Sequence, residues 1–264
     1  YSFIPSLGLS VPAFWQLANE FGRRERMDGI LAYMFTMIRE AHRCGRPLTR
    51  QQLTEAGRDI RLFPGVEGWF GRINAFGASL GVTVEHYIIS SGLKEILEGC
   101  SIGAEFKEIF ASEFYYGEDG EAAWPKLAVN YTSKTQFVYR INKGVLDVSD
   151  DKTLNDSMPD DSKRVPFTNM IYLGDGLSDV PCMKMMQSYG GASIAVYKEM
   201  GQSVKDLLER GRVDYIYPAD YREGTGLDRT VKNIIRKMAT ADALSEENAR
   251  QLQMIRRSEE LSGQ

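Results

Sequence analysis

Residues Asn169-Met170-Ile171-Tyr172-Leu173-Gly174-Asp175-Gly176-Leu177-Ser178-Asp179 join a short apolar run to two carboxylates. The apolar part predicts a buried strand that ends at Gly174. Asp175 and Asp179 follow it, and Gly176 lets the backbone turn tightly between them. Carboxylates after a strand lie where open α/β sheets bind ligands, and Mg²⁺ favours one or two carboxylates together with substrate phosphate. The alternative is a solvated loop after a core strand.

The composition limits the classes of function. The chain has 264 residues, a mass of 29.7 kDa, 43% apolar residues and a net charge of -4. No basic block with interleaved aromatic residues occurs, so we expect no nucleic-acid partner. No apolar run approaches the length of about 18 residues that a membrane span needs.

The cysteines and histidines argue against several kinds of site. Cys44, Cys100 and Cys182 are scattered, which favours a reducing compartment, and we expect a cytoplasmic protein. Only His42 and His86 are present, so a histidine-based metal cluster is not expected. A Ser-His-Asp triad would have to use one of these two, and neither lies in a motif.

Residues 1–62 read as a helical unit. Ser10 can cap a first helix, and Thr49 followed by Gln52 is a capping-box signature for a third. Between them, a second helix carries one apolar stripe, made of Ile30, Met34, Met37, Ile38 and Ala41. No strand is predicted here.

After Phe63-Pro64-Gly65-Val66 the pattern changes to alternating helices and strands. Helices are predicted at 67–80, at 93–98, from Thr132 or Ser133 onward, around Met183, Met185 and Met186, and at 204–208. Strands are predicted at 86–89, in the apolar run that ends at Gly174, at 192–196 and at 214–217, with an apolar stretch at 106–110 and a hairpin of 114–116 with 127–129. This alternation predicts an α/β fold with a doubly wound, mostly parallel sheet. We divide the chain into a helical unit (1–62), an α/β core (63–238) and a C-terminal helix (239–264).

The segment 147–161 holds six aspartates and almost no apolar residues. A solvated surface loop explains it best, because it lacks the glycine-and-glutamate pattern of a calcium-binding loop.

Three groups of residues that could take part in binding or catalysis lie at the ends of predicted elements. Ser90 ends a strand, and the amides of Ser91 and Gly92 behind it can face an anion. Lys134 begins a helix, where the helix dipole disfavours a cation, which hints at a bound anion, although a solvated lysine is the simpler reading. With Asp175 and Asp179, these residues form the parts of a phosphate site.

In this order the motifs resemble those of the haloacid dehalogenase (HAD) superfamily, closest to its phosphoserine-phosphatase-like branch. Ile88-Ile89-Ser90-Ser91-Gly92 resembles the second motif, and Lys134 in Tyr131-Thr132-Ser133-Lys134-Thr135 resembles the third. Gly174-Asp175-Gly176-Leu177-Ser178-Asp179 resembles the fourth, with Ser178 where that branch often has Asn. The helical unit is placed like the cap domain of that family.

The first motif of the family, an Asp-x-Asp after an N-terminal strand, is missing. Asp28 and Asp59 lie in helical context and do not match it. The resemblance places the missing strand between those that end at Ser90 and Asp175. Because the chain begins at Tyr1, we expect a natural protein with roughly 15–25 further residues upstream, enough for one strand and its connection. The chain as given is expected to be inactive.

The resemblance implies a phosphomonoester hydrolase that forms an aspartyl-phosphate intermediate on a small phosphorylated metabolite. Ser90, Ser91 and Gly92 would hold the phosphoryl group and Lys134 would balance its charge. Asp175 and Asp179 would ligate Mg²⁺. One alternative is a non-catalytic phospho-ligand-binding protein. Another, a nucleotide or methyl-donor binder, lacks its expected glycine-rich loop. The substrate and the oligomeric state stay open.

Overall fold

The N-terminal unit is helical, as predicted. The computed structural model describes residues 3–159 and 162–262. The unit contains η1 (Ile4–Leu7), α1 (Val11–Glu25), α2 (Gly29–Arg43) and α3 (Arg50–Gly57). The side chain of Ser10 accepts a hydrogen bond from the amide of Ala13, and Thr49 and Gln52 form the predicted capping box. These local signals therefore set the starts of two helices.

The first sheet follows this unit. α4 (Val66–Ser79) leads into β1 (Tyr87–Leu93), and α5 (Lys94–Glu98) and η2 (Gly103–Glu105) connect β1 to β2 (Glu108–Tyr116). β1 and β2 run parallel, and β3 (Ala122–Leu127) pairs with β2 antiparallel. The predicted hairpin is present, with its turn at residues 117–120, but its second strand is Ala122–Leu127 and not residues 127–129.

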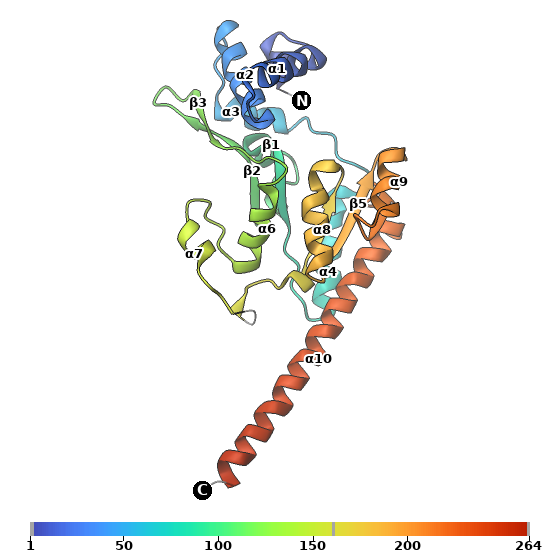
Figure 1. Cartoon of the computed structure of the whole chain (residues 1–264). Helices are drawn as coiled ribbons and strands as arrows, with labels where there is room; N and C mark the ends of the chain where they lie inside the picture. Colours follow the sequence, from blue (N-terminus) through green and yellow to red (C-terminus); the bar gives the residue numbers. More distant parts are fainter. Residues whose placement is uncertain (1–2, 160–161, 263–264) are drawn as a thin grey trace.

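The second sheet is parallel throughout. α6 (Lys134–Lys143), α7 (Asp151–Asn155) and η4 (Phe167–Asn169) precede β4 (Ile171–Gly174). Then come η5 (Leu177–Asp179), α8 (Val180–Ser188), β5 (Ala192–Tyr197), α9 (Gln202–Glu209), β6 (Tyr215–Pro218) and α10 (Gly226–Ser262). The strand order is β4-β5-β6. α10 runs without a break through residue 238, where we placed a boundary, and its last turns extend away from the remainder of the molecule (Figure 1).

The strands form two three-stranded sheets instead of the single predicted sheet. Within the described residues, β1 pairs only with β2 and β4 only with β5, so no ladder joins β1 to β4. Residues 87–91 of β1 and 171–173 of β4 are half-buried, whereas most of β2 and β5 is fully buried. Strands in the middle of a covered sheet are normally the most buried. β1 and β4 are edge strands of their sheets, because no described strand lies between them, and their partial exposure follows from that position.

The helical unit lies against the end of the first sheet. The hydroxyl of Tyr33 in α2 donates to the carbonyl of Ser91 at 2.8 Å, and the side-chain amide of Asn130 donates to Asp28 at 3.2 Å. α3 and α5 approach so closely that a β-carbon on Gly99 would lie 1.8 Å from the carbonyl oxygen of Thr54. Only glycine fits this crossing. Among the described helices, none has the length and apolar composition that crossing a membrane requires.

A charged cluster links the segments that lead into β1 and β4. The carboxylate of Glu85, just before β1, binds both terminal nitrogens of Arg164, which precedes β4. Lys107 and the hydroxyl of Tyr87 donate to the same carboxylate. The hydrogen bonds from Arg164, and then those from Lys107 and Tyr87, outweigh burial and lower the pKa of Glu85 to about 2.

The cluster predicts a loss of stability in acid. Because the pKa of Glu85 is lower in the folded protein than its ordinary 4.5, the unfolded chain binds the proton more readily. Its contribution should be complete above pH 4.5 and disappear as the pH falls toward 2. Urea unfolding of the wild type and Glu85→Gln should therefore differ at neutral pH and converge in acid. The exposed Glu118→Gln is the control, and a gap between wild type and Glu85→Gln that stays constant down to about pH 3 would contradict the assignment.

Candidate active site

The turn after β4 brings two of the predicted residues into one small structure. Gly174 is required here, because a β-carbon would lie 2.6 Å from the β-carbon of Asp179. The turn folds back so that the amides of Asp175 and Gly176 both donate to Oδ2 of Asp179 at 3.2 Å. The Asp179 carboxylate therefore holds the turn that presents Asp175.

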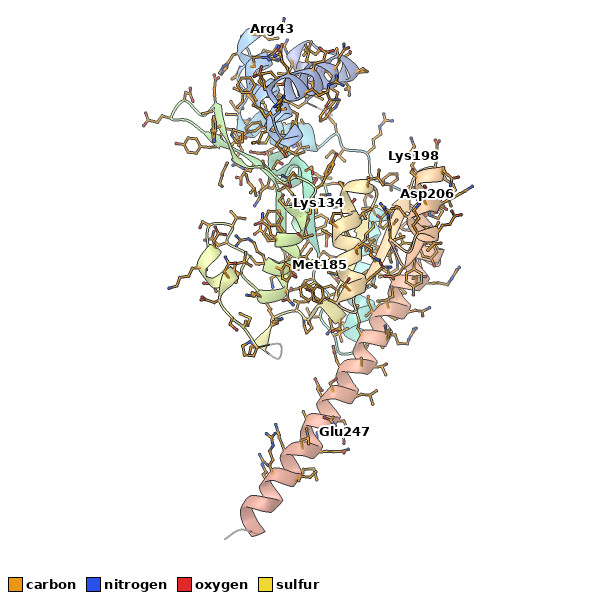
Figure 2. All side chains as sticks on the ribbon, viewed as in Figure 1. Arg43, Lys134, Met185, Lys198, Asp206 and Glu247 are labelled. Atoms are coloured by element: carbon orange, nitrogen blue, oxygen red, sulfur yellow. The ribbon has the colours of Figure 1, made fainter. Side chains whose placement is uncertain are left out.

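Lys134 and Asp179 form a buried ion pair. Nζ of Lys134 lies 2.7 Å from Oδ1 of Asp179, and the residues are 6% and 4% exposed. The hydroxyl of Tyr172, in β4, donates to the same oxygen at 2.8 Å. Lys134 also lies 3.4 Å from the hydroxyl of Ser178. Figure 2 shows Lys134 at the end of α6 that faces the N-terminal helices.

Burial fixes the protonation of two neighbouring groups. Burial first, and then the charge of Asp179, raises the pKa of Tyr172 far above its ordinary value, so this hydroxyl stays a donor. Burial also raises the pKa of the Cys182 thiol to about 11. A thiol in this state is a poor nucleophile at neutral pH.

Asp175 is the exposed carboxylate of the turn. Burial, and then the charge of Asp175, raises the pKa of nearby Tyr221 to about 12. No hydrogen bond or ion pair engages the side chain of Asp175 within residues 3–159 and 162–262. This carboxylate is therefore available for a cation or a ligand.

Ser90, Ser91 and Gly92 lie at an irregularity at the end of β1, where the register with β2 shifts. Oγ of Ser90 accepts from the amide of Gly92 at 3.0 Å, so both groups are engaged with each other. Oγ of Ser91 is buried and has no hydrogen-bond partner. Across the part of the chain that the structure describes, no hydrogen bond joins these residues to Lys134 or Asp175.

The residues fit Mg²⁺ in part. An ionised carboxylate offers about four lone-pair sites, and Asp179 already accepts four hydrogen bonds, from Lys134, Tyr172, Asp175 and Gly176. It therefore has no free site for a metal in this arrangement, whereas Asp175 does. No cluster of three or more His, Cys, Asp or Glu side chains suited to a metal occurs among the described residues. Mg²⁺ can nevertheless be held by one carboxylate, waters and substrate phosphate.

Two contacts of this site were not predicted from sequence. We assigned Tyr172 only to a strand and Tyr33 only to a helix. In the structure, the hydroxyl of Tyr172 donates to Asp179 and the hydroxyl of Tyr33 donates to the carbonyl of Ser91. For Tyr172 the sequence carries a weak signal. Successive side chains of a strand point to opposite faces, so Tyr172 points away from the face on which its apolar neighbours pack. For Tyr33, 58 positions from Ser91, local sequence carries no signal.

Comparison with known proteins supports the fold. No family model matches the chain. A crystal structure of a HAD family hydrolase from Salmonella enterica subsp. enterica serovar Typhi matches with a TM-score of 0.53 and 15% identity, over 83% of this chain. The match spans 61% of that hydrolase's length. An uncharacterized protein of Borreliella burgdorferi is 27% identical over 217 residues, which is 75% of this chain and 74% of that protein. The chain thus has a mixed α/β fold with parallel strands, similar to that of a HAD hydrolase.

Proposed function

We propose that the chain forms the phosphate- and metal-binding part of a HAD-type phosphomonoester hydrolase. The observation that carries the proposal is the turn after β4, where a buried Lys134–Asp179 pair holds an exposed Asp175 at the carboxyl end of a parallel strand. Ligands bind at this edge in open α/β sheets. The fold similarity to a HAD hydrolase supports the proposal of this chemistry by analogy.

Each residue receives a role in the proposal. Lys134 supplies positive charge for the phosphoryl group, and Asp179 orients Lys134 and the turn. Asp175 holds Mg²⁺, which when bound would neutralise charge on the phosphate. Ser90, Ser91 and Gly92 contact phosphoryl oxygens after the Ser90–Gly92 hydrogen bond opens. The helices of residues 1–62 act as the cap that covers the substrate, a small phosphorylated metabolite.

The nucleophile of this reaction is not among the residues of the site. No two aspartates of the sequence are separated by a single residue, so the chain contains no Asp-x-Asp. Catalysis through an aspartyl-phosphate would need a carboxylate from outside residues 1–264. We therefore expect the chain alone to bind phosphate with Mg²⁺ but not to hydrolyse an aryl phosphate.

Replacing Asp175 by asparagine tests the metal role. Calorimetry with inorganic phosphate and Mg²⁺ should show a tenfold or larger loss of affinity, about 1.4 kcal/mol or more, because the neutral amide is a weaker ligand. The melting temperature should change little, since Asp175 is exposed. Asp206→Asn, at a half-buried aspartate on α9 that pairs with Arg210, is the control. Equal phosphate affinity in Asp175→Asn and wild type, with and without Mg²⁺, would reject the proposed metal site.

The missing nucleophile favours a second candidate, a non-catalytic phospho-ligand-binding protein. The buried Cys182 thiol, with its raised pKa, offers no replacement. Both candidates predict phosphate binding, and hydrolysis by the natural gene product with Mg²⁺ separates them.

A further inference from the structure

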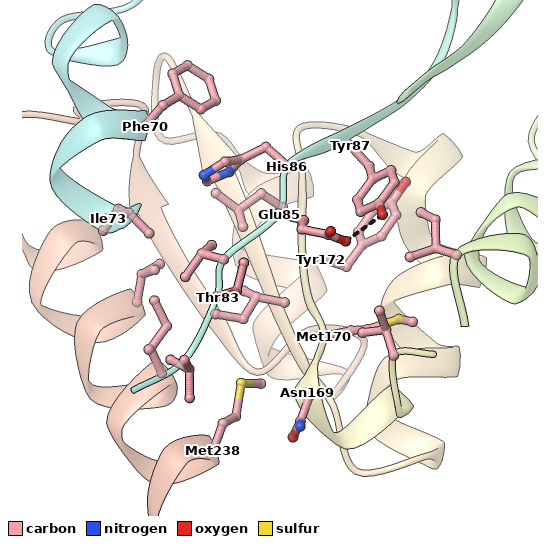
Figure 3. Close-up of a pocket in the computed structure, with 18 of the residues that line it drawn as sticks. Phe70, Ile73, Thr83, Glu85, His86, Tyr87, Asn169, Met170, Tyr172 and Met238 are labelled. Carbon is pink, nitrogen blue, oxygen red and sulfur yellow. Dashed lines mark hydrogen bonds between the residues drawn. The ribbon is translucent and has the colours of Figure 1, made fainter. Parts of the chain in front are cut away.

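The two parts of α10 lie in different surroundings. In its first part, Val231, Ile234 and Ile235 are buried in one apolar cluster with α4, and Met238 borders a cavity beside α4 (Figure 3). Every residue from 243 to 257, in contrast, is exposed. We call residues 243–257 the distal segment, and its length is about 22 Å. Figure 2 shows Glu247 on this segment, well away from Lys134.

The distal segment holds large apolar side chains in contact with water. Four of them are 48–68% exposed, namely Leu244, Leu252, Met254 and Ile255. A helix of this length is only marginally stable by itself in water, and helices in proteins gain most of their stability by packing an apolar face. The distal segment therefore has the character of an interface helix.

The spacing of one stripe on the segment fits a second copy of the same helix. Leu244, Asn248, Gln251 and Ile255 follow one another at intervals of four, three and four residues, as the a and d positions of a coiled coil do. These intervals are the same in both directions along the helix. An antiparallel copy would therefore place Leu244 against Ile255 and Asn248 against Gln251, twice each, as a two-fold axis requires.

The charges of the segment favour the same orientation. Between residues 240 and 257 all acidic side chains precede all basic ones, with Asp242, Glu246 and Glu247 before Arg250, Arg256 and Arg257. Antiparallel helices bring the acidic half of one copy next to the basic half of the other. Parallel helices would instead bring like charges together, which is unfavourable.

We infer that α10 binds α10 of a second copy of this chain, as an antiparallel pair of helices. The distal segments form the contact. Leu244 of each copy packs on Ile255 of the other, and the amides of Asn248 and Gln251 meet at the centre, where polar side chains fix the register. Because the contact lies away from Lys134 and Asp175, the inference does not rest on the proposed function.

Sedimentation equilibrium of the full chain tests the association. Between about 5 and 500 µM, the mean mass should rise from 29.7 kDa toward twice that value, as expected for an association in the micromolar range. Ile255→Arg places a charge in the contact and should raise Kd by about tenfold or more. Gln253→Arg adds the same charge on the opposite face of α10 and is the matched control. Both variants should keep the wild-type Tm in dilute solution, since both positions are exposed.

Disulfide cross-linking tests the orientation, in a chain with Cys44→Ser and Cys100→Ser. Leu244→Cys and Ile255→Cys should not form a covalent dimer alone but should do so when mixed, because only antiparallel helices bring these two positions together. Strong cross-linking of Leu244→Cys with itself would overturn the antiparallel pair. A mass of 29.7 kDa at every concentration, or a dimer that Ile255→Arg and Gln253→Arg affect equally, would overturn the whole inference.

Discussion

Lys134→Met is expected to lower the free energy of unfolding by about 3–5 kcal/mol, the cost of removing one partner from a buried ion pair. The carboxylate of Asp179 is 4% exposed and would lose the only cation within 4 Å among the described residues. Tyr172 and two amides would still donate to it, so the value should fall toward the lower end of the range. Urea unfolding followed by circular dichroism measures the difference.

A double variant separates the buried charge from the lost packing. Lys134→Met combined with Asp179→Asn removes both charges and should recover at least half of the loss, because no uncompensated carboxylate remains. Lys205→Met, at an exposed position on α9, should stay within about 0.5 kcal/mol of wild type. A Lys134→Met protein as stable as Lys205→Met would mean that the pair contributes nothing to the fold.

Sequence reasoning succeeded where the signal is local. The starts of helices α1 and α3 follow from Ser10 and from the Thr49–Gln52 capping box, whose partners are three residues apart. The hairpin follows from the glycine-containing turn between two apolar runs. Its first strand was predicted in two pieces, because Ser112 and Glu113 interrupt the apolar pattern.

The interruption has a tertiary cause. Ser112 and Glu113 are buried, and Glu113 pairs with Arg50 at 2.8 Å and with Lys126 at 3.1 Å. Polar residues therefore continue the strand because partners far away in sequence satisfy them. The contact of Tyr33 with Ser91 could not be predicted for the same reason, because the two residues lie far apart in the sequence. The order of Ser90, Lys134 and Asp175 predicted that they lie at one edge of one sheet. That β1 and β4 belong to two separate sheets depends on strand pairing, which local sequence patterns do not reveal.

The candidate site is divided between the two sheets. Ser90 lies in the second half of β1, whereas Asp175 follows β4, so their separation is set by the distance between the two sheets. Lys134 and Asp179 are held to the β4 side by their own ion pair. In the proposed function the spacing of these two groups matters, because positioning is a main contributor to phosphoryl transfer.

The described part of the acidic segment 147–161 is mostly exposed, as its composition predicts, and Arg140 organises its first part. Its guanidinium donates to the carbonyls of Asp147, Val148 and Asp150 and to the carboxylate of Asp151, at 2.7–3.3 Å. Arg140 itself is 1% exposed. Residues 151–155 form the short helix α7, and residues 160–161 lie outside the described part.

Arg140→Met should therefore lower the free energy of unfolding by about 3–4 kcal/mol. A hydrogen bond with a charged group contributes about 1.5–3 kcal/mol, and water will replace part of what is lost in this surface segment. Arg140→Lys should recover only a minor part, because one ammonium cannot reach four acceptors in a fork geometry. Arg250→Met, which removes an exposed pair with Glu247, should cost less than about 1 kcal/mol. Proteolysis should cut near residues 147–156 first in Arg140→Met, since this segment loses its anchor. If the segment stays as resistant as in wild type, charge repulsion among its aspartates, and not Arg140, sets its conformation.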